Sequence, residues 1–595
     1  MGQFFKFVFA SCLGVCLAML ALFFLGIVSI AGLAGSADEG TIKKAESNSV
    51  LEIKLTNSIP ELTDNVDKSP FETHKVSGLT DIVKGIDYAA TDNNIKGIVI
   101  NTPMPMMGMA SASVLRQSLE NFKKSGKFIY AYGDYYTHKG YYLASVADNV
   151  MINPMGGIEF MGLSAEIPFM KGLFGKLDIK WQIYYAGQFK SATEPFRLDK
   201  MSDQNRLQTR EYVEGIYGHI LDKIAASRNM SAVELRTIAN DYSARTSHKA
   251  VALKLADTEG YYDQLLTMLR TKMGIKDNGK INTIGINDYA QSVKKTGNTA
   301  KDRIAVIYAE GDITMNLGGG SGESNGGIEG GRYAKMIRKL RSDKNIKAIV
   351  LRVNSGGGSS FASDIILREL DLARQQGIPV IASFGDYAAS GGYYIAMASD
   401  SIFAEPTTLT GSIGVFGMIP GMQNTFKNKL GISFDTVKTG KYSAMSGVTI
   451  HFTDDEGKII QESIDSTYER FLYLVSKNRG KSRDDIHAVA QGRVWLGDKA
   501  KQLGLVDAIG GLDAAINAAA SKANLKTYKT VEYPKSKSGI DKFLEEFTGS
   551  KPTDELVNAA LKSELGEYYD TYMDIKRLKN MKGPQMRIPF VINIK

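Results

Sequence analysis

The sequence predicts an α/β protein made of two tandem copies of one domain. Continuous apolar runs of strand length alternate with segments of helical periodicity, which is typical of a largely parallel sheet covered by helices. Several of these segments recur once along the chain, at a nearly constant spacing of about 250 residues. A chain of 595 residues is also too long for a single hydrophobic core, so its length fits a duplicated domain.

The duplication rests on short matching segments that follow the same order in both halves. The matching segments are 95–100 with 346–351, 133–135 with 385–387, 140–142 with 392–394, and Asp257 and Gly260 with Asp507 and Gly510. We therefore predict one copy over residues 45–300 and a second over residues 301–535. The tail, 536–595, has the pattern of a charged helical stretch that ends in an apolar strand-like segment, Ile588–Ile594.

Each copy is expected to contain the same elements in the same order. Strands separated by helices are predicted at 51–55, 97–101 and 127–132 in the first half, and at 304–308, 348–353 and 379–384 in the second. Later in each copy, Ser202 and Thr453 are expected to cap long amphipathic helices, because their hydroxyl oxygens can accept hydrogen bonds from the first free N–H groups.

The N-terminus contains an apolar segment long enough to cross a membrane. Residues 7–33 carry no charge, and as a helix they would extend about 40 Å, against a hydrocarbon core of about 30 Å. The short basic N-terminus, 1–6, favours the cytoplasmic side, so the body of the chain is expected outside. A cleaved signal peptide is the alternative, but its apolar part would span only about 7–15 residues. We favour an uncleaved signal anchor.

Composition excludes several kinds of chemistry. The only two cysteines, Cys12 and Cys16, lie inside the apolar segment, so the rest of the chain can form no disulfide, no Cys-ligated zinc site and no thiol nucleophile. The net charge of +8 is spread along the chain without a dense basic block, which favours an ordinary solvated surface over a nucleic-acid partner.

The second copy has the features of a serine nucleophile. Ser390 lies between small residues at a predicted strand-to-helix turn, where a substrate backbone could approach its hydroxyl closely. The first copy has His138 at the equivalent position. A serine before two glycines is more often a cap or turn residue. A glycine-rich loop in the same copy makes the nucleophile the stronger interpretation.

That loop is suited to binding an oxyanion. Gly356, Gly357 and Gly358 follow a predicted strand, and glycines there let the backbone turn sharply and expose N–H groups. The first copy has prolines in this region, which lack the N–H donor. We expect Gly357 or Gly358 to act together with Gly391, whose N–H lies at the start of the next helix.

The best candidate for the general base is Lys190, since none of the six histidines lies in a recognisable triad motif. Its counterpart in the second copy is Tyr442, so one copy keeps the serine and the other keeps the lysine. At an ordinary pKa near 10.4, only about one lysine in 2,500 is neutral at pH 7. Burial beside Phe189 and Phe196 would lower that pKa. The alternative is a solvated surface lysine, the usual state of this residue.

Five motifs resemble those of the long, tandem-repeat form of the serine–lysine protease IV family, the bacterial signal peptide peptidase A type. The motifs are Gly187–Phe196, Asn354–Ser359, Ala388–Tyr393, Gly411–Gly417 and Gly492–Trp495, within a resemblance that runs from the apolar segment to about residue 520. One departure is Gly356, where the family usually has proline, and it leaves open whether Gly357 or Gly358 faces the oxyanion.

The resemblance implies a ClpP/crotonase-type fold in each half and degradation of remnant signal peptides after their release from exported proteins. It implies that Ser390 attacks, that Lys190 is the base and that Ser412 orients the lysine amine. It also implies no metal or other cofactor, a bowl-like homotetramer, and catalytic domains held by a single span on the periplasmic side of the bacterial inner membrane.

Two other classes of function stay open on the sequence. A duplicated domain that has lost function in one copy could be a non-catalytic membrane scaffold or adaptor, which would lack a reactive Ser390. An acyl-CoA hydratase or thioesterase follows from fold analogy alone. The sequence shows no obvious carboxylate pair for that chemistry, and a soluble acyl-CoA substrate fits poorly with a membrane anchor.

Overall fold

The computed structural model describes residues 43–63, 76–294, 299–315, 327–535 and 583–588, and the single positions 14, 19 and 561. The predicted anchor lies outside these ranges apart from two positions, and so does most of the tail. Among the residues that the structure describes, no helix is both long and apolar enough to cross a bilayer.

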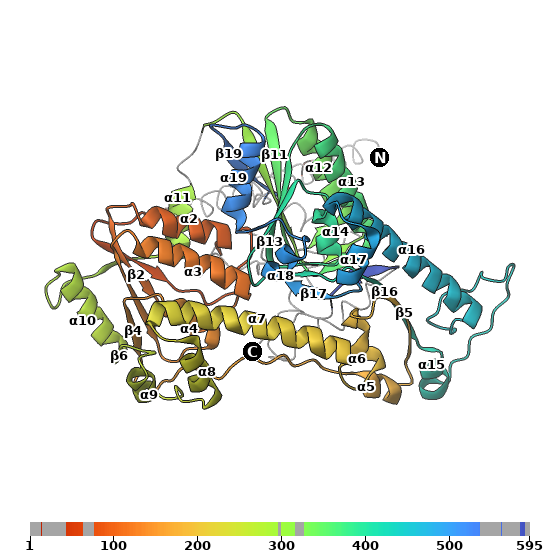
Figure 1. Ribbon diagram of the computed structural model, residues 1–595, viewed down its shortest axis with the longest axis horizontal. Helices are drawn as coiled ribbons and strands as arrows, with labels where there is room; N and C mark the ends of the chain where they lie inside the picture. Colours follow the sequence, from red (N-terminus) through yellow and green to blue (C-terminus); the bar gives the residue numbers. More distant parts are fainter. Residues whose placement is uncertain are drawn as a thin grey trace, which may run out of the picture.

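The first half is built on a six-stranded parallel sheet in the order β6-β4-β3-β2-β1-β7 (Figure 1). Its strands are β1 Ser49–Ile53, β2 Ile95–Ile100, β3 Phe128–Gly133, β4 Asn149–Ile152, β6 Thr258–Glu259 and β7 Asn282–Gly285. The first three overlap the three strands predicted in this half. Their apolar residues are buried on both faces, as expected for a parallel sheet between helices.

The second half repeats this plan in a larger sheet. The main path is β17-β15-β13-β11-β8-β19, and β14 pairs with β13 and with β18. Its strands are β8 Arg303–Glu310, β11 Ile346–Ser355, β13 Val380–Ala389, β14 Ser401–Ala404, β15 Leu409–Gly411, β17 Val494–Leu496, β18 Ala508–Ile509 and β19 Lys529–Tyr533. The central order β13-β11-β8 matches β3-β2-β1 of the first half, which confirms the predicted duplication in a mixed α/β fold.

Equivalent helices cover the two sheets. The helices of the first half are α2 Leu79–Ala89, α3 Met109–Lys123, α4 His138–Ala144, α5 Lys171–Lys176, η1 Ser191–Thr193, α6 Glu194–Arg197, α7 Asp203–Arg228, α8 Ala232–Asn240, α9 Ser247–Ala252, α10 Tyr262–Met273 and α11 Ile286–Lys294. Those of the second are α12 Gly330–Ser342, α13 Ser360–Gln375, α14 Gly391–Ala396, α15 Gln423–Leu430, α16 Asp454–Arg479, α17 Arg483–Val489, α18 Gly497–Gln502 and α19 Leu512–Lys522.

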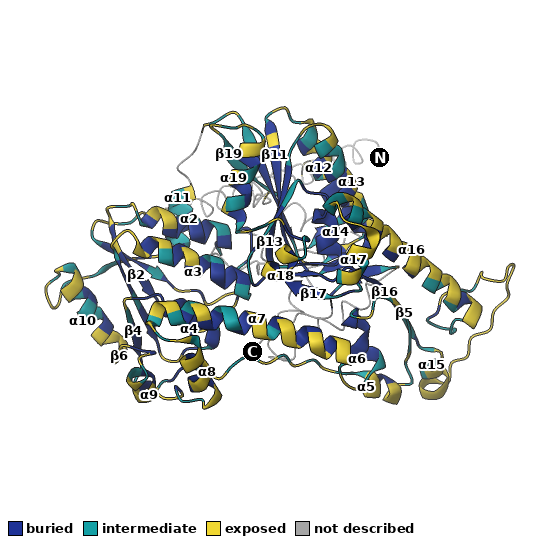
Figure 2. Ribbon diagram, viewed as in Figure 1, coloured by how far each residue is buried: buried dark blue, intermediate teal, exposed yellow. Residues whose placement is uncertain are grey.

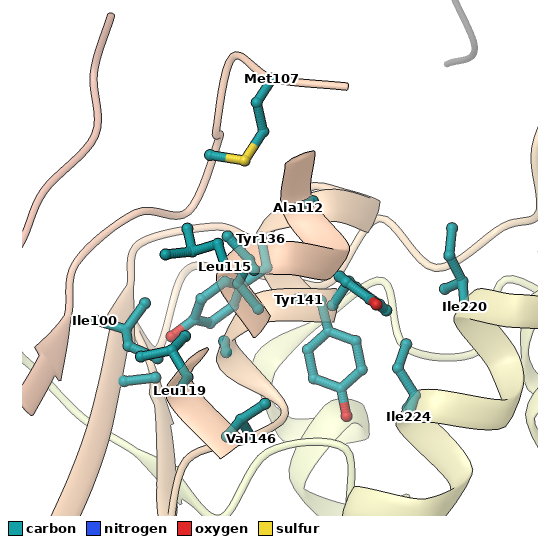
Figure 3. Close-up of a cluster of buried hydrophobic side chains, with 14 of the residues drawn as sticks. Ile100, Met107, Ala112, Leu115, Leu119, Tyr136, Tyr141, Val146, Ile220 and Ile224 are labelled. Carbon is teal, nitrogen blue, oxygen red and sulfur yellow. The ribbon is translucent and has the colours of Figure 1, made fainter. Parts of the chain in front are cut away.

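The two longest helices begin where the sequence predicts. Ser202 caps α7 by accepting from the Asn205 N–H, and Thr453 forms a capping box with Glu456 at the start of α16. In the first core, Leu115 and Leu119 of α3, Tyr141 of α4 and Ile220 of α7 belong to one buried cluster (Figure 3). Helix α7 also runs on from this core to β17 of the second half, so it ties the halves together.

A third sheet, which the sequence did not predict, combines strands from both halves and from the tail. Its order is β10-β9-β12-β20-β16-β5. Its strands are β5 Lys180–Ala186, β9 Ile313–Thr314, β10 Ile328–Glu329, β12 Gly357–Ser359, β16 Val415–Gly421 and β20 Gln585–Arg587. Strand β5 of the first half pairs antiparallel with the whole of β16 of the second. The tail strand β20 ends just before the predicted segment Ile588–Ile594, whose residues from 589 onward lie outside the described ranges.

Buried polar contacts also join the halves. The Arg352 guanidinium donates two hydrogen bonds, of 2.9 and 3.0 Å, to the carboxylate of Glu61, and both side chains are 3% exposed. The Ser111 N–H, at the start of α3, donates to Asp386 Oδ1 at 3.0 Å. Both contacts link distant parts of the chain, and the Arg352–Glu61 pair does so away from water, so they help to fix the relative position of the two sheets.

Candidate active site

Ser390 is held in a strained turn between β13 and α14. Its backbone angles are φ 55° and ψ −113°, and it is fully buried. A non-glycine residue rarely adopts a positive φ, and such strain persists only where the surroundings impose it. The Ser390 N–H donates to the Gly411 carbonyl at 2.8 Å, which helps to hold the turn. The predicted strand-to-helix turn is therefore present.

Lys190 lies between β5 and η1, and its Nζ reaches across to the second half. Nζ is 2.8 Å from Ser390 Oγ, 3.0 Å from Ser412 Oγ and 3.1 Å from the Ser412 carbonyl oxygen. The structure thus brings together the side chains of Ser390, Lys190 and Ser412, which the sequence singled out. Lys190 and Ser390 are 200 residues apart in the sequence. The contact forms within one chain.

Burial controls the charge of the lysine. Lys190 is 1% exposed, and the three hydrogen-bonding partners of its Nζ are two hydroxyls and a carbonyl, none of them charged. Because desolvation penalises the ammonium form, burial lowers the pKa of Lys190 well below its usual range. A neutral amine can accept a proton from a hydroxyl within hydrogen-bond reach.

The loop around Gly492 positions Lys190, a role that the sequence did not reveal. The Phe189 N–H donates to the Gln491 carbonyl at 2.8 Å. Gly492 has φ +80°, and a Cβ there would lie 2.6 Å from the Lys190 backbone nitrogen and 2.7 Å from its Cα. Only glycine allows this approach. The resemblance included Gly492 in a motif but gave it no role.

The loop 411–413 links the serine and lysine sides. Ser412 also has a positive φ, of 49°, and its N–H donates to the Arg493 carbonyl at 2.7 Å. The Arg493 guanidinium lies over the rings of Phe189 and Trp495, at 4.8 and 4.1 Å from their centroids. This loop therefore holds the Ser390 turn through Gly411 and the Lys190 segment through Arg493.

The three glycines predicted as oxyanion donors lie beside Ser390. Gly357 and Gly358 have φ of +104° and +156°, and a Cβ on Gly391 would be 3.0 Å from the Gly358 nitrogen. The Gly357 N–H already donates to Ser355 Oγ at 3.1 Å. The N–H groups of Gly358 and Gly391 are therefore the better candidates for meeting a developing negative charge.

Other sequence candidates lie elsewhere. Tyr442, the counterpart of Lys190, is 42% exposed on the segment between α15 and α16. His138, the counterpart of Ser390, starts α4, and its Nε2 accepts from the Met161 N–H at 3.2 Å. Burial lowers the pKa of His138 to about 4. Within the described ranges, no group of three or more His, Cys, Asp or Glu side chains could hold a metal ion.

Comparison with known proteins defines the class of this protein as a serine peptidase. Protease 4 from Haemophilus influenzae is 34% identical over 465 residues, which cover 76% of this chain and 74% of that protein. Protease 4 from Salmonella typhi is 33% identical over 529 residues, or 87% of this chain and 84% of that protein. The chloroplastic serine protease SPPA of Arabidopsis thaliana is 32% identical over 446 residues, or 74% and 65%.

The family follows from a second comparison. The family model for peptidase family S49 matches residues 121–276 and 372–526, once in each half, and the chain belongs to this family. Among solved structures, a ClpP1 mutant from Listeria monocytogenes covers 36% of this chain and 94% of that chain, with 18% identity and a TM-score of 0.24. A likeness at that score does not establish a shared fold.

Proposed function

We propose that this chain is a membrane-anchored endopeptidase whose catalytic dyad is Ser390 and Lys190. The observation that carries the proposal is the 2.8 Å contact between Lys190 Nζ and Ser390 Oγ in a buried site. Serine needs a base within hydrogen-bond reach, and a lysine can fill that role only when it is neutral. The lowered pKa of Lys190 meets the second requirement.

The proposed reaction proceeds by acyl transfer. Lys190 Nζ takes the proton of Ser390 Oγ while the oxygen attacks the peptide carbonyl carbon. The resulting oxyanion accepts hydrogen bonds from the N–H groups of Gly358 and Gly391. The lysine ammonium then gives its proton to the leaving amine as the C–N bond breaks. A water molecule, deprotonated by the neutral lysine, hydrolyses the ester and restores Ser390. Ser412 orients the amine through its hydrogen bond to Nζ.

We propose cleaved signal peptides and other apolar peptides as substrates. A relative from Enterococcus faecium, 35% identical over 209 residues, bears the name putative signal peptide peptidase SppA. The apolar segment 7–33 would anchor the chain in the bacterial inner membrane, with both ClpP/crotonase-type halves on the periplasmic side. Substrates left in the bilayer would then be close to the site.

We also propose that copies of the chain assemble into a ring, with the tetramer implied by the resemblance as the expected size. In the first half, the segment after α5 forms β5 and pairs with β16. Its counterpart in the second half, 432–438, follows α15 and is exposed throughout, with Ile432, Phe434 and Val437 open to solvent. Figure 2 shows this segment at the outer edge of the molecule. An apolar extended segment of this kind is suited to pairing with a neighbouring copy.

The dyad is tested by hydrolysis of a fluorogenic apolar peptide by the detergent-solubilised full chain. Ser390→Ala and Lys190→Met should each lower kcat/KM by at least about a thousandfold, because each removes one half of the proton-transfer pair. Lys139→Met is the control, since Lys139 is half-buried and donates to the Met107 carbonyl in the first half, away from Ser390. Full activity in Lys190→Met would exclude the dyad. No cleavage by folded wild-type protein, with no acylation of Ser390 by a fluorophosphonate, would favour a scaffold.

A further inference from the structure

Gln208 is a buried residue of α7 whose side-chain amide contacts both halves of the protein. It is 2% exposed. Its Nε2 donates to the Phe189 carbonyl oxygen at 3.2 Å and to Ser191 Oγ at 3.1 Å. Its Oε1 accepts from the Val494 N–H, at the start of β17, at 3.2 Å. Because a backbone carbonyl can only accept and a backbone N–H can only donate, these contacts fix which end of the amide faces each half.

The amide lies between the two residues of the proposed dyad. In the first half, the residues that it binds flank Lys190 on both sides. In the second half, Val494 is opposite Gly411 in the antiparallel pair of β17 and β15. The Gly411 carbonyl accepts from the Ser390 N–H at 2.8 Å. Gln208 therefore connects the segment that carries Lys190 with the strand pair that holds the Ser390 turn.

Neighbouring side chains hold the amide in one orientation. Gln208 Nε2 also lies 3.2 Å from Asn205 Oδ1, one turn earlier in α7. Asn205 Nδ2 donates to Glu194 Oε2 at 2.9 Å, and Ser202 Oγ donates to Glu194 Oε1 at 2.6 Å. Asn205 and Glu194 are both buried. A buried polar network whose members are paired in this way is rigid, so Gln208 is well placed to hold its partners.

The second half has no such amide at the equivalent position. Gln208 lies six residues after Ser202, the cap of α7, and the residue six positions after Thr453, the cap of α16, is Ile459. Ile459 is 37% exposed. The amide is thus present only in the copy that carries the lysine. This difference between the copies favours a role connected with the lysine over a role in forming the helix.

We propose that Gln208 is a positioning residue, which keeps Lys190 within reach of Ser390 by joining the lysine segment to β17. This inference rests on the proposed function for the chemistry that the dyad performs. Without the amide, the Lys190 segment would loosen against the second half. A shift of about 1 Å in a catalytic group costs about a hundredfold in rate, and water that entered the site would favour the charged form of the lysine.

The first test is Gln208→Met in the full chain, because methionine has nearly the shape of glutamine but cannot form the amide hydrogen bonds. In hydrolysis of the fluorogenic peptide, kcat should fall about thirtyfold or more, while KM should change by less than about twofold. The rise of kcat/KM with pH should also move about one unit higher, since a more hydrated lysine keeps its proton longer. A variant that only lowered the amount of folded protein would keep the wild-type pH profile.

A second variant and a matched control accompany it. Ser191→Ala removes one acceptor of the same amide and should lower kcat about fivefold. Combined with Gln208→Met it should add nothing, because the contact is already lost. Thr209→Val is the control, since Thr209 is also buried on α7 but its hydroxyl contacts Asn205 and Tyr212 within that helix. Thr209→Val should keep the kcat and the pH profile of the wild type.

Three results would overturn the inference. The first is a wild-type kcat and pH profile in folded Gln208→Met protein. The second is a loss of kcat in Thr209→Val equal to that in Gln208→Met. The third applies if urea unfolding shows that Gln208→Met does not fold, in which case an unchanged kcat in Ser191→Ala decides against the role.

Chemical labelling of Lys190 separates this inference from the proposed dyad. The probe is sulfo-NHS acetate, which acetylates accessible neutral amines, and the rate at Lys190 is followed by mass spectrometry. In the wild type Lys190 is 1% exposed and should react slowly, whereas Gln208→Met should raise the rate about tenfold or more. If the wild type cleaves no peptide but Gln208→Met still raises this rate, Gln208 holds the lysine and the dyad fails as a catalyst. If the wild type cleaves peptide through Ser390 and Lys190 while Gln208→Met changes neither kcat nor labelling, the dyad stands and the positioning role fails.

Discussion

The segments that follow α5 and α15 occupy equivalent places in the two halves but differ in structure. In the first half the segment forms β5, pairs with β16 and ends at the buried Lys190. In the second, residues 432–442 are exposed, and they include Tyr442, the counterpart of the lysine. The comparison teaches that the environment of Lys190 comes from the other half. A lysine has a lowered pKa here because Ser390, Ser412 and Gly492 of the second half enclose it and shield it from water.

The largest expected effect comes from moving the lysine to the other copy. Lys190→Met combined with Tyr442→Lys should stay at least about a thousandfold below wild type in kcat/KM, no better than Lys190→Met alone. The reason is that position 442 is exposed, so its amine would stay charged and have no defined path to Ser390. Hydrolysis of the fluorogenic peptide measures this. Restored activity in the double variant would mean that the two segments are interchangeable.

A smaller effect is expected at the glycine that lets the two halves approach. Gly492→Ala should lower kcat about a hundredfold, because its Cβ would push the Lys190 backbone away and a shift of about 1 Å in a catalytic group is costly. Gly431→Ala is the matched control, since Gly431 also has a positive φ, of +67°, but has no neighbour within 4 Å of its Cβ. That control should lose about 1 kcal/mol of stability and keep its kcat. Equal kcat losses in both would point to general destabilisation.

The smallest effect is on the pH dependence of stability. Since the pKa of Lys190 is lower in the folded than in the unfolded chain, the unfolded state binds more protons between these two pKa values. Stability therefore falls as pH drops through this window, by about 1.4 kcal/mol per unit at most. Lys190→Met removes this dependence. Urea unfolding of both proteins from about pH 10 to pH 7 should show the wild type losing free energy of unfolding relative to the variant.

The activity of the wild type should depend on the same deprotonation of Lys190 and change with pH in the same direction. The amine must lose its proton to act as a base, so kcat/KM should rise as pH rises through the lowered pKa of Lys190 and then stay level. A pH profile that falls in this range, or a stability difference that does not change with pH, would contradict a buried neutral lysine.

The sequence predicts the local features well because each depends on short-range patterns. Apolar runs mark β1 to β3 and β8, β11 and β13, and Ser202 and Thr453 mark the starts of α7 and α16. Comparison of the two copies singled out Ser390, Lys190 and the glycine loop. A segment's own residues predict that it forms a strand. They do not predict which other strand it pairs with.

What the sequence did not predict depends on long-range pairing. Strand β20 is only three residues long and lies far along the chain from β12, so no periodicity marks it. The role of Gly492 depends on how closely it approaches Lys190, a distance that no local pattern contains. Likewise, the sequence does not distinguish the N–H groups of Gly357 and Gly358, because the hydrogen bond from the Gly357 N–H to Ser355 Oγ depends on how the loop folds.

The two residues of the proposed dyad lie in different halves of the chain, and this has a consequence for biosynthesis. Lys190 leaves the ribosome 200 residues before Ser390, and at about 5–20 residues per second this is an interval of about 10–40 s. Their contact also requires β5 of the first half to pair with β16 of the second. A nascent or half-folded chain therefore has a nucleophile without its base, or a base without its nucleophile. Under the proposed mechanism, the protein cannot cut neighbouring unfolded polypeptides until its own folding is complete.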